Sequence, residues 1–100
     1  MRPKVELDPD VDDEAPNGFD LITPYDEVHF ITYLRLLDAE ADGADWREIA
    51  QIVLHRDPAA DGTRTRRCWE SHLDRAHWMT KRGYRHLLTQ AAEDAKGYDA

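Results

Sequence analysis

The residues best suited to chemistry in this chain are three arginines, Arg64, Arg66 and Arg67, at the start of a predicted long helix. Guanidinium groups bind phosphates and base edges, and the first turn of a recognition helix presents such side chains to DNA. Further basic residues that would meet phosphates are Arg75, Lys81, Arg82 and Arg85. On an ideal helix, however, Glu70 and Asp74 share the outer face with Arg67 and would repel phosphates. A structural interpretation is that Arg66 pairs with Glu70 four residues on.

Cys68 and His72, spaced i and i+4, are the other side chains with reactive or metal-binding chemistry. Their types suit zinc, but their spacing matches no standard zinc motif, and His77 points about 140° away from His72 on an ideal helix. No glycine loop for phosphates is present, and no loop near Cys68 would hold a substrate. We therefore expect no metal, no cofactor and no catalytic residues, and a protein that is not an enzyme.

The charge is unevenly divided along the chain, whose formal net charge is −8. Residues 1–45 hold 13 Asp+Glu and 3 Lys+Arg, a net of −10, whereas residues 46–100 hold 8 and 10, a net of +2. Because DNA affinity depends on neutralising phosphates, this acidity opposes DNA binding. Three interpretations remain open: a solvated tail, a deterrent to DNA, or a complement to a basic partner.

Composition also bounds the location of the protein. The longest apolar runs, such as Val53-Leu54, are too short to span a bilayer, and residues 1–4 turn acidic without an apolar stretch that would indicate a signal peptide. A single cysteine, Cys68, fits a reducing compartment. We expect a cytoplasmic protein with no membrane partner.

The chain divides into three parts. Like charges and prolines in residues 1–18 oppose regular structure, which predicts a disordered acidic arm there. Residues 19–92 predict one helical domain, and residues 93–100 a frayed tail.

The domain is predicted to be all-α, a small bundle of about four helices. Thr23 is a good N-cap followed by Pro24, and Gly43 ends the first helix. Asp45 caps a short second helix. A turn over residues 55–62, longer than the usual helix-turn-helix connection, leads to a third helix over about 63–82, and a fourth follows from Tyr84.

Three tryptophans are many for so small a core. The helical spacing places Trp46 and Trp69 on buried stripes, whereas Trp78 lies opposite the stripe of its helix. Trp78 is therefore either covered by another element or exposed as an anchor for a protein partner.

Several motifs together resemble a proteobacterial domain family found in regulators of integrative and conjugative elements. They are residues 23–27 (Thr-Pro-Tyr-Asp-Glu), 33–39 (Tyr-Leu-Arg-Leu-Leu-Asp-Ala), 43–50 (Gly-Ala-Asp-Trp-Arg-Glu-Ile-Ala), 57–58 (Asp-Pro), 71–80 (Ser-His-Leu-Asp-Arg-Ala-His-Trp-Met-Thr), 83–84 (Gly-Tyr) and 87–88 (Leu-Leu). The resemblance covers residues 20–90 and implies a helix-turn-helix variant with an extended turn. In activator members the domain looks like a DNA binder with a basic face, joined to a second, N-terminal domain.

This sequence departs from the activator pattern twice, since only a short acidic arm precedes the first helix and the overall charge is acidic. Both departures fit an antiactivator, which binds an FseA-like transcriptional activator through that activator's non-DNA-binding N-terminal domain and blocks conjugative-element excision and transfer genes. DNA binding would then be weak or absent. The residues we expect at the partner surface are Arg35, Asp38, Arg75, Trp78 and Tyr84. The alternative is a direct DNA-binding regulator that uses Arg64, Arg66 and Arg67.

Overall fold

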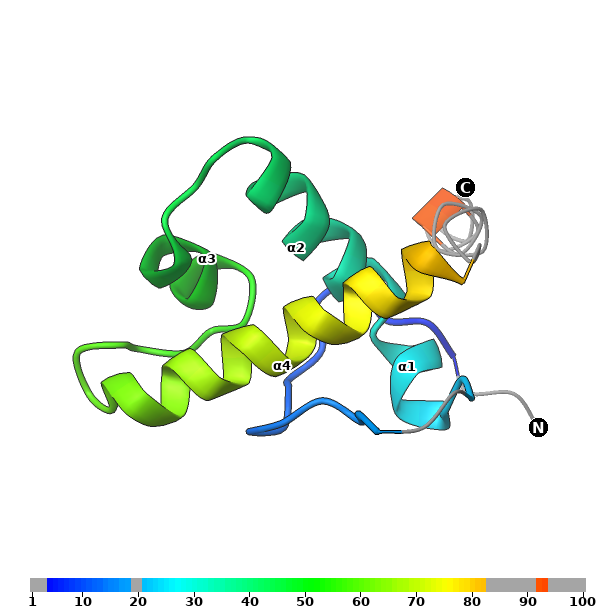
Figure 1. Ribbon diagram of the computed structural model, residues 1–100, viewed down its shortest axis with the longest axis horizontal. Helices are drawn as coiled ribbons and strands as arrows, with labels where there is room; N and C mark the ends of the chain where they lie inside the picture. The colour runs from blue at the N-terminus through cyan, green and yellow to red at the C-terminus, as the bar shows by residue number, and fades with distance from the viewer. Residues whose placement is uncertain (1–3, 19–20, 83–91, 94–100) are drawn as a thin grey trace.

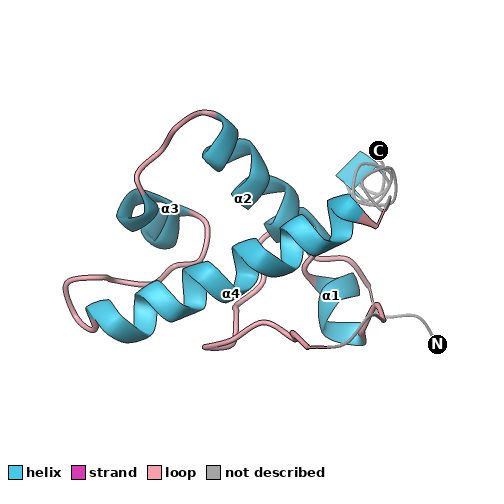
Figure 2. Ribbon diagram, in the orientation of Figure 1, coloured by secondary structure: helices cyan, strands magenta, loops and turns pink. Residues whose placement is uncertain are grey.

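The computed structural model describes residues 4–18, 21–82 and 92–93 of the chain. Within them the regular structure is helical, with no strands (Figures 1 and 2). The helices are α1 (Pro24–Val28), α2 (Phe30–Ala41), α3 (Trp46–Ile52) and α4 (Gly62–Lys81). The all-α class is thus confirmed. Of the predicted fourth helix and the tail, only residues 92–93 fall within the described residues.

The first predicted helix is divided into α1 and α2 at His29. Thr23 and Asp26 form the capping box that starts α1, with Pro24 in its first turn. At His29 the backbone leaves helical geometry, with φ −102° and ψ 17°. In a continuous helix the Val28 carbonyl would accept the amide of residue 32, but here it accepts the amide of Glu6 at 3.2 Å. The break therefore depends on a contact with the arm, which helical periodicity alone does not predict.

Helix α2 ends where the sequence predicts, at a glycine in the left-handed region. Gly43 has φ +75°, its amide donates to the Glu40 carbonyl, and the Ala44 amide donates to the Ala39 carbonyl. This pair of bonds is a Schellman motif. Asp45 then caps α3 by accepting the Arg47 amide at 3.2 Å.

Helices α3 and α4 form a helix-turn-helix pair joined by the long turn over residues 53–61. Asp57 stabilises this turn, because its carboxylate accepts the Ala59 amide at 2.9 Å and its carbonyl accepts the Thr65 hydroxyl at 3.3 Å. Asp61 caps α4 by accepting the Arg64 amide at 3.1 Å. The extended turn is thus confirmed, and it begins two residues earlier and ends one residue earlier than the predicted range 55–62.

The core lies where α4 crosses α2 and α3 (Figure 1). Tyr33 and Leu36 of α2 and Ala76 and Met79 of α4 are fully or almost fully buried in it. Trp69 and Trp78 are partly buried and pack against the same cluster. Val11, from the arm, is also a buried member of the core.

The arm is irregular in backbone, but residues 4–18 are packed against the domain and not detached from it. Pro9, Val11 and Ala15 are buried. In Figure 1 this segment, drawn in blue, runs along the side of α4 and past α1. The sequence predicts a disordered arm, whereas in the structure a few small apolar side chains and backbone hydrogen bonds hold residues 4–18 against the domain.

Candidate nucleic-acid interface

The arm is fastened to the helices mainly through its backbone. The Asp12 amide donates to the Tyr25 hydroxyl at 3.0 Å, and the Ala15 amide donates to Ser71 Oγ at 3.0 Å. The Val11 carbonyl accepts from Arg56 Nη2 at 2.6 Å, and the Asp12 carbonyl accepts from the Cys68 thiol at 3.4 Å. These bonds fix the arm beside α4 without using its acidic side chains.

A chain of three hydrogen bonds connects the arm to the interior of α4. His72 Nδ1 lies 2.7 Å from the Cys68 carbonyl, which only accepts, so Nδ1 carries the proton. Its Nε2 therefore accepts from the Tyr25 hydroxyl at 2.6 Å, and that hydroxyl in turn accepts the Asp12 amide. Burial lowers the pKa of His72 to about 4 and raises the pKa of Tyr25 to about 12, so both side chains are neutral at pH 7.

Two acidic side chains of the arm, Asp13 and Glu14, face two of the arginines predicted to contact DNA, Arg64 and Arg67. Asp13 Oδ1 lies 2.7 Å from Arg56 Nη1, and Asp13 Oδ2 lies 2.8 Å from Arg64 Nη2. Glu14 Oε1 lies 3.2 Å from Arg67 Nη1. Hydrogen bonds from Arg64 and Arg56 lower the pKa of Asp13, so the carboxylate stays ionised beside them.

Arg66 has a different set of contacts, on the side of α4 that meets α3. Its Nε donates to Glu70 Oε1 at 2.6 Å, which confirms the predicted pair within the helix. Its guanidinium also lies 4.9 Å from the ring centre of Trp46 and 5.1 Å from that of Trp69. Arg66 and Trp46 line an open hollow of about 440 Å³ beside the long turn. Arg66 is therefore part of a packed cation–π cluster.

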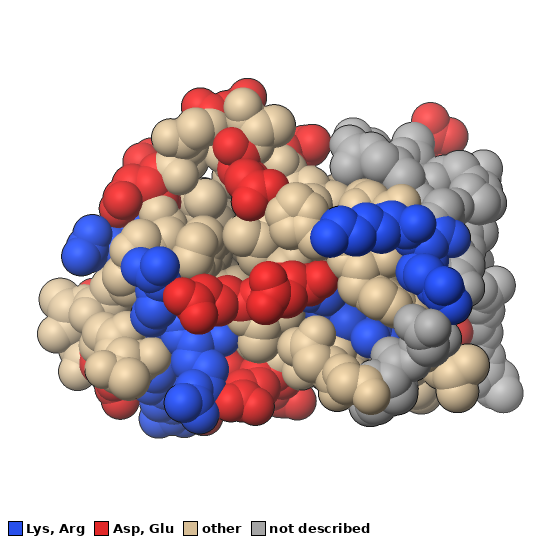
Figure 3. All heavy atoms as spheres, viewed as in Figure 1, with Lys and Arg blue, Asp and Glu red and all other residues tan. Residues whose placement is uncertain are grey.

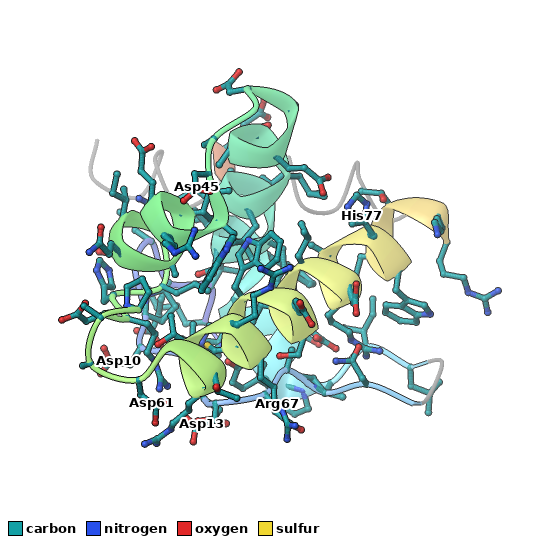
Figure 4. The ribbon with its side chains drawn as sticks, turned by 60° about the vertical axis from the view of Figure 1, so that its left-hand side comes forward. Asp10, Asp13, Asp45, Asp61, Arg67 and His77 are labelled. Carbon is teal, nitrogen blue, oxygen red and sulfur yellow. The ribbon has the colours of Figure 1, made fainter. Side chains whose placement is uncertain are left out.

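The face of the molecule that carries α4 has acidic and basic side chains side by side. Figure 3 shows blue and red groups interleaved there, and Figure 4 shows Asp13 beside the first turns of α4, on the same edge as Arg67. The arginine cluster predicted from the sequence is thus present, but each of its members contacts a carboxylate of this chain. Asp13 and Glu14 were not predicted as partners of these arginines, because their only signal in the sequence is the charge difference between arm and helix.

The residues predicted for a protein partner are not gathered on one exposed surface. Arg35 is half-exposed and lies 3.1 Å from Asp8 of the arm, and Asp38 is exposed on α2. Trp78 is partly buried beneath the Arg75 guanidinium, which lies 3.9 Å from its ring centre. Tyr84 lies outside the described residues.

Arg75 is buried, so its predicted role as an exposed contact is wrong. Its Nη2 lies 2.8 Å from Asp26 Oδ2 and its Nε 3.1 Å from Asp26 Oδ1, in a two-point ion pair. Tyr33 donates a further hydrogen bond to Asp26 at 2.7 Å. Burial raises the pKa of Asp26, but hydrogen bonds from Arg75, Thr23 and Tyr33 outweigh it, and the net effect is a lowered pKa. The helical wheel could not reveal this, because the partner comes from α1.

The other side chains with reactive or metal-binding chemistry, Cys68 and His72, make hydrogen bonds within the fold. Burial raises the pKa of the Cys68 thiol, which disfavours the nucleophilic thiolate. Within residues 4–18, 21–82 and 92–93, no three His, Cys, Asp or Glu side chains gather as a metal site. None of the helices in those residues is long and apolar enough to cross a membrane.

A helix-turn-helix pair whose second helix begins with an arginine cluster defines a domain of the transcription-regulator class. The chain belongs to the RovC DNA-binding domain family, described as "T6SS, Transcription factor, DNA binding domain", whose model matches residues 10–89. This is a family of transcription-factor domains and not of enzymes. The match includes residues 10–18, in agreement with the packing of the arm onto the helices. No curated protein matches the chain.

Proposed function

We propose that this member of the family regulates transcription through protein contact, as an antiactivator of the QseM type. It would bind an FseA-like activator through that activator's non-DNA-binding N-terminal domain and block conjugative-element excision and transfer genes. One observation carries this proposal: the arginines at the start of α4 are paired with carboxylates of the chain itself. A net charge of −8 adds a repulsive field toward DNA.

The surface proposed for the activator centres on Arg35 and Asp38 of α2. Arg35 is half-exposed and Asp38 is exposed, so a partner can reach both. Trp78, on α4, is a further proposed contact, and Tyr84, outside the described residues, stays a prediction from the sequence. Arg75 would act only indirectly, because it is buried and its guanidinium packs over the Trp78 ring.

Direct binding to the purified activator tests this proposal. We expect Arg35→Ala and Asp38→Asn each to weaken the complex at least tenfold by isothermal titration calorimetry, and to restore transcription from an activator-dependent reporter. Gln51→Ala, on the exposed side of α3, is the matched control and should leave both readouts unchanged. If native-like chains carrying either change inhibit as the wild type does, the proposed surface is wrong.

The second candidate is a regulator that binds DNA directly through Arg64, Arg66 and Arg67. The description of the family favours it. It requires wild-type chain to shift a duplex at low salt, with binding that weakens steeply as salt rises and is lost in Arg67→Ala. The absence of a shift at low salt would remove this candidate.

A further inference from the structure

We propose that Arg56, Arg64 and Arg67 form a latent binding surface for the phosphate backbone of duplex DNA, and that Asp13 and Glu14 of the arm keep it closed. The inference deepens the proposed function, on which it rests in one respect: native chain binds DNA weakly. The carboxylates of Asp13 and Glu14 are the proposed cause of that weak DNA binding.

The arm's carboxylates occupy the positions that phosphate oxygens would take. Asp13 uses both of its oxygens, one toward Arg56 at 2.7 Å and one toward Arg64 at 2.8 Å. Glu14 meets Arg67 one turn further along α4 at 3.2 Å. An extended segment with oxygens directed at successive guanidinium groups presents the chemistry of a short phosphodiester backbone.

The arm is positioned without these carboxylates, so their charges can be removed while its path is kept. Val11 and Ala15 are buried, and the Asp12 and Ala15 amides and the Val11 carbonyl hold the backbone. By contrast, the side chains of Asp13 and Glu14 are about half-exposed. Exposed ion pairs of this kind contribute little to the free energy of folding. Their main effect is electrostatic.

The arginines are placed so that a duplex can reach them. The side chains of Arg64 and Arg67 are 60% and 69% exposed, both on the N-terminal half of α4. Arg56, at 24%, is oriented by the Val11 carbonyl and precedes α4 in the long turn. Three guanidinium groups against two carboxylates give this surface a charge of +1, and without the carboxylates it becomes +3.

The test is the double variant Asp13→Asn/Glu14→Gln, with fluorescence anisotropy of a labelled 20-base-pair duplex of arbitrary sequence as the readout. We expect at least tenfold tighter binding than wild type at low salt. The slope of log affinity against log salt should steepen by about two, since about 0.9 counterions are released per neutralised phosphate. Circular dichroism establishes that each variant keeps the helical fold.

Two further variants make the result specific to this surface. Glu6→Gln/Asp42→Asn removes two exposed carboxylates elsewhere, raises the net charge equally from −8 to −6, and should gain much less. Adding Arg64→Ala/Arg67→Ala to the first variant should abolish the gain. Equal gains in the two carboxylate variants, no gain in either, or a gain that survives loss of the arginines would each overturn the inference. Because this assay contains no activator, its outcome is independent of whether the chain inhibits one.

Discussion

Two sets of arginine–carboxylate pairs in this small domain have opposite surroundings. Arg75 and Asp26 join α4 to α1 in the interior, with exposed fractions of 1% and 0%. Arg64 and Arg67 join α4 to the arm at the surface, where each pair is more than half-exposed on average. The chemical groups are the same, but the dielectric surroundings differ.

Because their surroundings differ, the buried and the exposed pairs have different roles. A buried ion pair cannot lose one partner without leaving a charge in the interior, so Arg75 and Asp26 fix the orientation of α1 against α4. An exposed pair exchanges its partner with water, ions or another anion at little cost. The interior pair therefore supports the fold, whereas the surface pairs determine which charge the start of α4 presents.

The largest loss of stability is expected when Arg75, the cation of the interior pair, is removed. We expect Arg75→Ala to destabilise the domain by about 3–5 kcal/mol, because Asp26 is left buried without its cation. Urea denaturation followed by circular dichroism measures the loss. Arg67→Ala, the matched exposed change, should leave the unfolding midpoint nearly unchanged, and comparable effects from the two substitutions would show that burial does not separate the pairs. A chain carrying Arg75→Ala that fails to fold agrees with the expectation.

Acidification probes the hydrogen-bonded chain between the arm and the interior. The pKa of His72 is about 4 in the fold against 6.5 in the unfolded chain, so between these values the unfolded state binds more protons. Stability should therefore fall as pH drops from about 6.5 to 4, by roughly 3 kcal/mol in total. Unfolding free energies measured across this range give the slope.

His72→Gln supplies the control for that slope, because glutamine is neutral at every pH while it can still accept from Tyr25. His55 and His77, which lie 2.7 Å from Asp8 and Glu40, are present in both proteins, so the comparison isolates His72. A slope unchanged by His72→Gln would place the pH dependence elsewhere.

The smallest expected effect on stability belongs to the surface pairs. Asp13→Asn/Glu14→Gln should leave the urea midpoint within experimental error, because the backbone of the arm stays anchored. Measuring that midpoint at low and high salt sharpens the comparison, since screening removes what little the exposed pairs contribute. A large loss of stability would mean that the carboxylates, and not the backbone bonds, hold the arm.

Features set by neighbouring residues were predictable from the sequence. Thr23 and Asp45 accept amides of their own first turns, and Gly43 stops α2 because it tolerates a positive φ. The pair of Arg66 with Glu70 follows from i, i+4 spacing alone. In each case both partners lie within a few residues, so helical geometry fixes their distance.

The sequence by itself determined the helix starts at Thr23 and Asp45, the helix end at Gly43, the long turn and the presence of an arginine cluster in a chain with an acidic arm. Only the tertiary structure decided that Arg75 is interior, that α1 and α2 part at His29, and that Asp13 and Glu14 meet the arginines. Each of these depends on groups more than 20 residues apart whose meeting is set by how α1, α4 and the arm pack together. A helical wheel gives the direction in which a side chain leaves its helix. It does not show which residues of another segment pack against that side chain.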